Sequence, residues 1–401
     1  MVEKNKYVFV VCGPEEHIRV LNYSVRCLKK VSRNEIIVIT ERKRNQAEIE
    51  HDRILDIETP AGFNDHQASI YLKTGIYKWL DMKHNYCYLD SDVIALHDDA
   101  DKIFGYFKEP VTFAADHCRL DVFSPYAANC GCSENAEAKK KKFYALQKSV
   151  NPDYDPELMF LTREGRELFS RLYDIGQRPF ANVFRIISYL GQKILPVKKI
   201  RMFGRYCFDK SKKAWTVPDG SIVFFDILGA QKEIEKQGEF RFHRLKKYWY
   251  DNTGNNIFDL RCNHLIEAIE KKYGLKITPQ NWQHWNGGVF LFNIISVGFL
   301  ESWHRKTIEN FSDPDWKTRD QGTLAATVWE SGLQNHPVLP SEYNFIADFY
   351  KPAISYRKNT GFTRDNFRST FNPRFIHVYH HFGDKNWEVW KAVEEITGEE
   401  Y

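Results

Sequence analysis

The stretch "NYCYLDSDVIAL", residues 85–96, sets two acids two positions apart behind an apolar run. The apolar "YCYL" predicts a buried strand, and an unpaired charge at its end would be costly to bury. Side chains at i and i+2 of a strand point the same way, so Asp90 and Asp92 can reach one ion or one diphosphate. The pair marks a candidate site, although two such acids can also cap a turn or lie in solvent.

Strand-like and helix-like segments alternate on both sides of this stretch. Apolar runs predict buried strands at 7–13, 35–40 and 110–116, and apolar residues at helical spacing predict helices at 14–31 and 69–82. Such an alternation indicates an α/β fold with a mainly parallel sheet covered on both faces. Ligands bind at the carboxyl ends of the strands in these sheets, where the two acids fall.

Composition limits the classes of protein. The chain has 401 residues with a formal net charge of +4, which is too small to imply a nucleic-acid partner. We find no apolar window long enough for a transmembrane helix and no signal-peptide pattern at the N-terminus. We therefore expect a cytoplasmic protein, with peripheral attachment to the inner face of the membrane as an alternative.

The eight cysteines are scattered along the chain, and we expect them to be reduced. Only Cys130 and Cys132 lie close together in sequence. A CxC pair is a weak signal for a metal site without a second pair.

Carboxylate oxygens suit Mg²⁺ or Mn²⁺, and either ion can bridge to the phosphates of a nucleotide. A second interpretation competes. Phosphatases of the haloacid-dehalogenase type carry DxDx(T/V) after an apolar strand, and "LDSDV" fits that pattern, with Asp90 as the nucleophile. That fold needs the motif on its first strand, whereas the pair here follows the third or fourth, which disfavours the phosphatase.

Five segments in order resemble motifs of one enzyme family. They are "YLDSD", "WNGGVFLFN", "RDQGTLAATVW", "LPSEYNF" and "IHVYHHFGDKNW". Together they resemble metal-dependent GT-A glycosyltransferases, particularly family 8, which includes glycogenin and bacterial lipopolysaccharide galactosyl- and glucosyltransferases. The resemblance implies a GT-A, Rossmann-like fold with a mixed, mainly parallel sheet flanked by helices.

The resemblance divides the chain into three parts. Residues 1–116 would form the nucleotide-sugar-binding part of the GT-A domain. Residues 117–280 would be a large insertion, rich in basic and aromatic residues. Residues 281–401 would complete the domain with the sugar and acceptor site and the C-terminal metal and diphosphate motif. The basic, aromatic segment 178–250 is compatible with an acceptor groove, with a surface for anionic lipid, or with plain structural packing.

The resemblance also implies site residues. The metal would be Mn²⁺ or Mg²⁺, held by Asp90, Asp92 and His380, with His381 as the alternative. The terminal motif departs from the family pattern, because Lys385 follows Gly383 one residue early and Asn386 replaces proline. The donor would be bound by Cys12, Gly13, His17, Lys73, Asp90, Asn286, Gly287, Gly288, Gly383 and Lys385.

The catalytic residues implied are Asp320 and Gln321. Asp320 would hydrogen-bond the donor sugar, and Gln321 would lie on the face opposite the leaving group, too weak a nucleophile for easy covalent catalysis. The implied function is transfer of a hexose from a UDP-sugar to a glycan or glycolipid acceptor, with retention, in polysaccharide biosynthesis. The alternatives are the phosphatase above and a catalytically degenerate module that binds carbohydrate or nucleotide.

Overall fold

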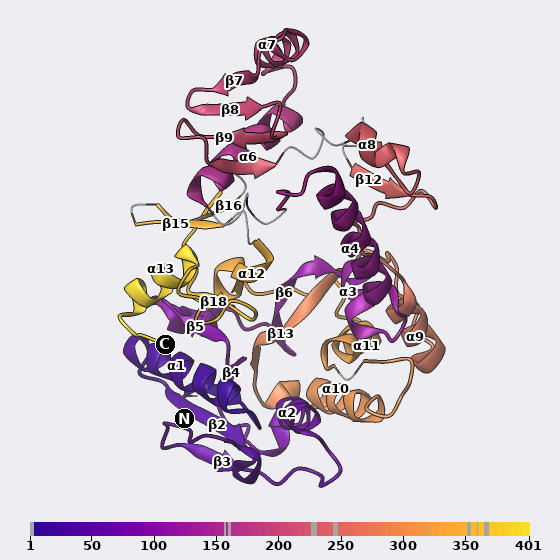
Figure 1. Cartoon of the computed structure of the whole chain (residues 1–401). Helices are drawn as coiled ribbons and strands as arrows, with labels where there is room; N and C mark the ends of the chain where they lie inside the picture. The colour runs from indigo at the N-terminus through magenta and orange to yellow at the C-terminus, as the bar shows by residue number, and fades with distance from the viewer. Residues whose placement is uncertain are drawn as a thin grey trace.

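A six-stranded sheet forms the centre of the molecule (Figure 1), with strand order β3-β2-β1-β4-β13-β6. The computed structural model describes residues 4–155, 158, 162–225, 231–243, 248–317, 319–350, 354–358, 360–364 and 369–401. The strands are β1 (Asn5–Val10), β2 (Glu35–Thr40), β3 (Ile54–Asp56), β4 (Asn85–Leu89), β6 (Thr112–Arg119) and β13 (Gln283–Phe292). The first four pair in parallel, and β13 runs antiparallel to β4 and β6. This topology confirms the predicted mixed, mainly parallel sheet.

Each face of the sheet has its own hydrophobic layer because successive strand residues point to opposite sides. Tyr7 and Phe9 of β1 pack in one cluster with the apolar face of α1 (Glu15–Val31). Val8 and Val10 pack in the other. The helices of that second layer are α2 (Asp65–Thr74), α3 (Leu120–Ala127), α9 (His264–Tyr273), α10 (Val297–Glu309) and α11 (Gln321–Glu330).

The helix predicted at 69–82 is shorter in the structure. The side chain of Asn64 caps α2 at its start, and α2 ends at Thr74 before Gly75. A 3₁₀ turn, η2 (Ile76–Lys78), follows. A Cβ on Gly75 would lie 2.9 Å from the carbonyl oxygen of Tyr71, so a larger residue could not close this helix end in the same way.

The C-terminal part folds back onto the centre through two small sheets. One has the order β14-β18-β5, and the other β15-β16-β17. Their strands are β5 (Val93–Ala95), β14 (Phe345–Ile346), β18 (Phe375–His377), β15 (Ser355–Arg357), β16 (Gly361–Arg364) and β17 (Ser369–Phe371). Next to them lie α12 (Ala347–Tyr350) and α13 (Glu388–Thr397). Since β5 directly follows the acidic pair, this sheet brings the C-terminal segment to Asp92.

The predicted insertion forms its own helices and strands, which lie away from the central sheet (Figure 1). It holds a four-stranded sheet of order β10-β9-β8-β7 and the hairpin β11-β12. Its elements are α4 (Cys132–Val150), α6 (Arg163–Gln177), α7 (Val183–Ile194), β7 (Lys199–Phe203), β8 (Tyr206–Asp209), β9 (Ala214–Thr216), β10 (Ile222–Phe225), α8 (Gln231–Lys236), β11 (Phe240–His243) and β12 (Tyr248–Asp251).

Small hydrophobic clusters around Trp215 and Trp249 hold these elements together. Both ends of the predicted insertion, in α3 and α9, pack instead in the main core. Parts of the basic segment, 226–230 and 244–247, lie outside the described residues. The described residues also form the 3₁₀ turns η1 (Arg42–Arg44), η3 (Ala100–Tyr106), η5 (Ile294–Ser296) and η6 (Ser341–Tyr343). Among the helices described, none is long and apolar enough to cross a membrane.

Candidate functional site

A cavity of about 410 Å³ opens at the carboxyl ends of β1 and β4. Its lining includes Cys12, His17, Lys73, Asp90, Asp92 and Asp320, all of which the sequence singled out. These residues come from widely separated parts of the chain. The fold therefore gathers most of the predicted donor-binding and metal-binding side chains in one place.

The acidic pair occupies the turn between β4 and β5. The Asp90 amide donates a hydrogen bond to the Gly288 carbonyl of β13 at 2.8 Å, which fixes the backbone of the turn. The Tyr88 hydroxyl donates to Asp90 Oδ1 at 2.7 Å. Both carboxylates face the cavity, as the i, i+2 spacing predicted.

Lys73 of α2 joins two acids across the cavity floor. Its Nζ lies 3.1 Å from Asp90 Oδ1 and 2.8 Å from Asp320 Oδ2. Burial alone would lower the pKa of Lys73, but Asp320 and Asp90 raise it well above its usual value. Burial would likewise raise the pKa of Asp320, and the Lys73 ammonium lowers it below its usual value. This lysine is therefore a fixed cation between two carboxylates.

The histidine that reaches the acidic pair is His377. Its Nε2 lies 3.2 Å from Asp92 Oδ1, and one ligating atom from each of Asp90, Asp92 and His377 lies within 4.8 Å of the others. Strand pairing explains the position: β18 runs antiparallel to β5 with His377 opposite Val93, and the Val378 amide donates to the Asp92 carbonyl at 3.1 Å. Burial would lower the pKa of His377, but Asp92 raises it above its usual value.

The predicted metal ligand His380, and its alternative His381, are not part of this group. His380 is exposed, and the His381 amide donates to Asp348 at 3.0 Å. Spacing to Gly383 favoured His380, but only His377 ends a strand that pairs beside the acids. The described geometry therefore groups His377, and neither His380 nor His381, with the two acids.

A buried chain of hydrogen bonds sets the orientation of His377. Asp116, within β6, accepts from Asn286 Nδ2 at 2.9 Å. Asn286 Oδ1 accepts from the Gly288 amide at 2.8 Å and from Asn344 Nδ2 at 3.1 Å. Asn344 Oδ1 then lies 2.9 Å from His377 Nδ1.

The direction of each hydrogen bond in this chain follows from two groups whose roles are fixed, the Asp116 carboxylate and the Gly288 amide. Nearby His117 and His284 outweigh burial and hold the pKa of Asp116 below its usual value, so its carboxylate only accepts. The Gly288 amide can only donate. The orientation of each side-chain amide is thereby fixed, and Asn344 Oδ1 must accept a hydrogen bond from His377 Nδ1–H. The other nitrogen, Nε2, is left facing Asp92, as a metal-binding imidazole requires.

The predicted glycines lie where β13 passes the cavity, in an irregular stretch of its pairing with β6. A Cβ on Gly288 would lie 2.7 Å from His377 Cε1 and 2.9 Å from Asp90 Oδ2. A Cβ on Gly287 would lie 3.3 Å from Asp320 Oδ2 and 3.4 Å from Lys73 Nζ. Gly288 in particular has no room for a side chain, because the acid and the histidine close over it.

Asp320 and Gln321 lie at the start of α11. The Trp303 indole donates to the Asp320 carbonyl at 2.9 Å, which anchors the helix start in the core. Gln321 has a buried Oε1 and interacts with His284, whose pKa burial lowers to about 4. Gln321 is not among the described residues that line the 410 Å³ cavity. It faces a neutral imidazole behind the cavity.

Two residues of the terminal motif, Gly383 and Lys385, were predicted to contact the donor. Lys385 is exposed and forms an ion pair with Glu394 of α13. Gly383 has a φ of +76°, a left-handed conformation that favours glycine, and it turns the chain toward the packed C-terminus. Neither is among the described residues that line the cavity, so their role at the diphosphate stays a prediction.

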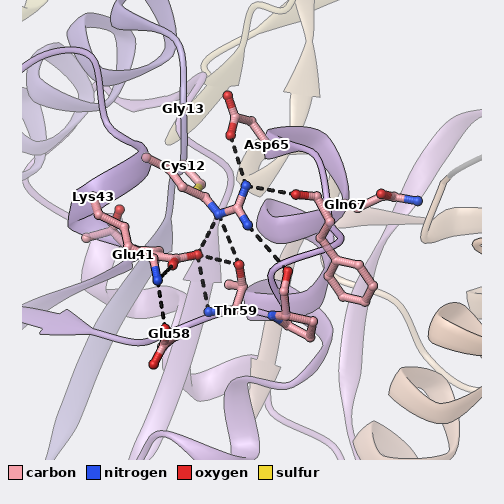
Figure 2. A network of polar contacts seen from close by, with 12 residues as sticks. Cys12, Gly13, Glu41, Lys43, Glu58, Thr59, Asp65 and Gln67 are labelled. Carbon is pink, nitrogen blue, oxygen red and sulfur yellow. Dashed lines mark hydrogen bonds and ion pairs between the residues drawn. The ribbon is translucent and has the colours of Figure 1, made fainter.

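Close to the end of β1, a network of charged groups supports the cavity rim (Figure 2). Arg44 of η1 donates to Glu41, to Thr59 and to Asp65, the last at 3.4 Å. Burial alone would raise the pKa of Glu41, but hydrogen bonds from Thr59 and Arg44 lower it to about 2. Gly13 has a φ of +97° and leaves room for Asp65, whose side chain would clash with a Cβ there.

The predicted donor contacts Cys12 and His17 border the same end of the cavity. Cys12 is buried, and burial raises the pKa of its thiol to about 11. It is therefore a neutral group at neutral pH. His17 is exposed in the first turn of α1. Asp65, which the sequence did not single out, supplies the carboxylate at this end of the cavity.

Asp90, Asp92 and His377 fit a divalent metal ion. Two carboxylates and one imidazole form a donor set suited to Mn²⁺ or Mg²⁺, and three protein ligands leave positions open for a substrate. Burial also raises the pKa of Asp90. A dication at this place would compensate the cost of burying the two acids.

The sequence missed His377 and Asn344, although each left a signal. His377 ends the apolar run "FIH", as Asp90 follows "YCYL". Asn344 lies in the segment "LPSEYNF", which was identified as a motif without a role for its asparagine.

No protein-family model matches the sequence, and a search of curated proteins returned no significant match. Among solved structures, the WbbM bifunctional glycosyltransferase in its apo form is similar over 100% of this chain and 50% of its own, with a TM-score of 0.42 and 9% identity. The galactosyltransferase LgtC, in complex with donor and acceptor sugar analogs, is similar over 98% of this chain and 95% of its own, with a TM-score of 0.39 and 11% identity.

Mouse xyloside xylosyltransferase 1, in its apo form, is similar over 93% of this chain and 97% of its own, with a TM-score of 0.35 and 10% identity. This chain spans half the length of WbbM. All three likenesses are loose. The function is therefore inferred from the side chains of the site.

Proposed function

We propose that this protein is a metal-dependent glycosyltransferase that moves a hexose from a UDP-sugar to a glycan or glycolipid acceptor. The observation that carries the proposal is that Lys73, Asp90, Asp92 and Asp320 line one cavity at the carboxyl edge of the sheet, with His377 in contact with Asp92. The five ordered motifs of the sequence, which resemble family 8 GT-A enzymes, support it independently. All five of these residues come from those motifs or from the helix before the first of them.

Asp90, Asp92 and His377 would hold Mn²⁺ or Mg²⁺ in this proposal. The bound ion would supply positive charge to the diphosphate as it leaves. The protein's own contribution is to hold the ligating side chains in the correct orientation. The hydrogen bond from His377 Nδ1 to Asn344 keeps Nε2 directed at the carboxylates, and the Asp90 amide holds the turn against β13.

The uridine end of the donor would lie toward Cys12, Gly13 and Asp65. Asp65 offers carboxylate oxygens that suit ribose hydroxyls or a base N–H, and Arg44 holds it in place. Cys12 would contribute a neutral, apolar surface to this end of the cavity. His17 at the rim would contact the donor from the first turn of α1.

The sugar would lie between the glycines of β13 and the start of α11. Lys73 occupies Oδ2 of Asp320, so Oδ1 is available to a sugar hydroxyl. The family resemblance would place Gln321 on the side of the anomeric carbon opposite the diphosphate, and its side chain would have to turn from His284 toward the cavity to reach it. An amide there is too weak a nucleophile to form an easy covalent intermediate, which supports retention by front-face displacement. Determination of the product anomer by NMR would test this, and an inverted product would rule out retention.

The phosphatase alternative fits the site poorly. Asp90 Oδ1 is held by both Tyr88 and Lys73, which leaves only Oδ2 for attack on a phosphoester. The acidic pair also follows the fourth strand in chain order. A degenerate binding module would keep donor affinity without turnover, which the following experiment separates.

The test is hydrolysis of a panel of nucleotide-sugars, with Mn²⁺ and with chelator. We expect Mn²⁺-dependent release of UDP from one donor, reduced about 10³-fold in Asp92→Asn. Asp98→Asn, which changes an exposed acid six residues on, is the matched control and should retain the wild-type rate. Donor binding without turnover would favour the degenerate module, and neither binding nor release would defeat the glycosyltransferase proposal.

For the acceptor, we propose that the insertion attaches the enzyme to an anionic membrane surface at the cytoplasmic face, where a glycolipid would be presented. The helix α7 stands far from the central sheet (Figure 1) and exposes apolar side chains. Phe184 is 85% exposed and Ile194 is 87% exposed, with the basic Arg185 and Lys193 on the same helix. Apolar and basic side chains together suit the interface of anionic lipid.

Vesicle flotation tests this attachment. We expect binding to vesicles with anionic lipid and little binding to neutral ones. The double change Phe184→Ser with Ile194→Ser should weaken binding more than about tenfold, because two exposed apolar anchors are lost. Ile294→Ser, which removes a side chain that is 61% exposed on η5, is the control. Equal binding by all variants would rule out α7 as the membrane contact.

A further inference from the structure

A second group of ligating side chains lies at the base of the insertion. It consists of Cys130, Cys132, Cys262 and His264, with one ligating atom from each lying within 4.8 Å of the others. Cys130 Sγ lies 3.9 Å from Cys262 Sγ, and Cys132 Sγ lies 3.6 Å from His264 Nδ1. The sequence showed only a CxC pair, and its partner, Cys-Asn-His at 262–264, comes more than a hundred residues later.

The two distances match the edges of a zinc tetrahedron. With Zn–S bonds of about 2.3 Å and Zn–N bonds of about 2.0–2.1 Å, two sulfurs are separated by about 3.8 Å and a sulfur and a nitrogen by about 3.6 Å. Disulfide bonding would instead need the sulfurs at about 2.05 Å. A single disulfide would also leave the other two members of the group unexplained.

The backbone around the group favours thiolates. Cys132 is the first residue of α4, and His264 is the first residue of α9, so the positive ends of two helix dipoles face the sulfurs. Gly131 has a φ of +69°, which lets the chain turn so that the cysteines on either side of it converge. Both pairs are therefore aimed at one point by the local backbone.

A hydroxyl also supports one of the sulfurs. Ser124 Oγ accepts a hydrogen bond from the Leu265 amide at 2.9 Å, and the same oxygen lies 3.1 Å from Cys262 Sγ. Because the amide must donate, the Ser124 proton is free to point at the sulfur. Such a donor stabilises a metal-bound thiolate and fixes its direction.

We propose that Cys130, Cys132, Cys262 and His264 bind a structural Zn²⁺ ion that joins the two ends of the insertion. Four protein ligands close the coordination sphere, which is typical of structural rather than catalytic zinc. The proposal does not depend on the glycosyltransferase function. Three thiols would lose their protons when the ion binds.

The site has a direct structural consequence. It lies where the loop after α3 meets the start of α9, and both helices pack against the first turn of α11. A Cβ on Gly322 would lie 3.2 Å from Leu265 Cδ1 and 3.5 Å from Ala127 Cβ. The zinc ion would therefore fasten the insertion and also brace the helix that begins at Gln321.

Metal analysis of the full-length protein, purified without added metal, is the first test. We expect about one zinc ion per chain, and close to none in the double variant Cys130→Ser with Cys262→Ser. Cys207→Ser, on β8 within the insertion, is the matched control and should retain its zinc. Asp92→Asn should also retain it, which separates this site from the acidic one. Wild-type protein without zinc, or with Cys130 and Cys262 joined in a disulfide, would overturn the proposal.

Substitution of cobalt for zinc keeps the test decisive if the double variant fails to fold. Co²⁺ in wild-type protein should show the sulfur-to-metal charge-transfer band and strong visible bands of a tetrahedral thiolate site. His264→Cys should still bind Co²⁺ with a stronger charge-transfer band, whereas His264→Ala should bind it at least about tenfold more weakly. Absence of the charge-transfer band from Co²⁺-loaded wild-type protein would exclude the site.

Discussion

The cavity beside β4 and the base of the insertion both gather potential metal ligands, yet they differ in almost every physical respect. Two carboxylates at the cavity meet the buried imidazole of His377, and Lys73 already provides a cation there. Three thiols and an imidazole converge on the partly exposed base of the insertion, where two helices begin. Hard oxygen ligands with an open position suit an ion that meets phosphate, and soft ligands in a closed set suit an ion that holds structure. The donor atoms alone therefore distinguish the site suited to an ion that meets substrate from the site suited to a structural ion.

Lys73→Met should have the largest effect, and it should act on the cavity only. The change leaves Asp90 and Asp320 facing each other without the buried cation, which we expect to lower the free energy of unfolding by about 3–5 kcal/mol. Denaturant unfolding measures this. Lys78→Met, at an exposed position after the same helix, should have little effect.

Mn²⁺ sharpens this prediction. Because a dication can replace the missing positive charge, Mn²⁺ should stabilise Lys73→Met more than it stabilises wild-type protein. The zinc content should not change. Equal stabilisation of both proteins by Mn²⁺ would show that the bound ion and the Lys73 ammonium do not interact electrostatically.

Asn344→Ala should come next, with Mn²⁺ binding about 10–100-fold weaker by calorimetry. The change removes the acceptor of His377 Nδ1 and frees the imidazole to rotate. Asn344→Asp keeps an acceptor oxygen and should recover most of the affinity. If the alanine variant bound Mn²⁺ normally, the buried hydrogen-bond chain would have no part in aiming the ligand.

Gly288→Ala should destabilise the protein by about 2 kcal/mol and weaken Mn²⁺ binding. The added methyl group would lie 2.7 Å from His377 Cε1, where rigid strands on both sides limit relaxation. Gly298→Ala, in α10, meets no atom within 4 Å and should slightly raise stability. Thermal unfolding of the two variants with and without Mn²⁺ compares them directly, and equal behaviour would mean that the cavity is not tightly closed at Gly288.

Glu41→Gln should have the smallest effect, about 1.5 kcal/mol at neutral pH. This change lies in the charged network at the rim (Figure 2), which contains none of the ligands of either group. The folded-state pKa of Glu41 is about 2, below its ordinary value of 4.5. Its contribution to stability is therefore complete above pH 4.5 and is lost as the pH falls through about 2.

Unfolding curves between these pH values provide the measurement. Wild-type protein should lose stability on acidification more steeply than Glu41→Gln, and the two should approach each other at the acidic limit. Parallel curves for the two proteins would show that the Glu41 carboxylate contributes nothing as a charged group.

Much of the fold and part of the site could be predicted from sequence because they depend on local patterns. The apolar runs predicted four of the six central strands, and the i, i+2 spacing placed both acids at a strand end. Lys73 and Asp320 were also singled out before their contact was known. The ion pairs between Lys73 and both acids needed the three-dimensional packing of α2, β4 and α11.

The histidine shows where local pattern fails. Spacing to Gly383 favoured His380, but the pairing of β18 with β5 places His377 opposite Val93 and beside Asp92. A register shift of one residue would turn the side chain to the other face of the strand. The spacing of residues along the sequence does not reveal the register in which β18 pairs with β5.

The sequence by itself determined the alternating strands and helices, the acidic turn after β4, and the glycines at the cavity, because each follows from side-chain size, charge and periodicity over a few residues. Only the tertiary structure decided which histidine meets the acids and that Cys130 and Cys132 have partners at Cys262 and His264. Those pairings join residues far apart in the chain, and their geometry is set by strand register and helix packing, which are properties of the whole core.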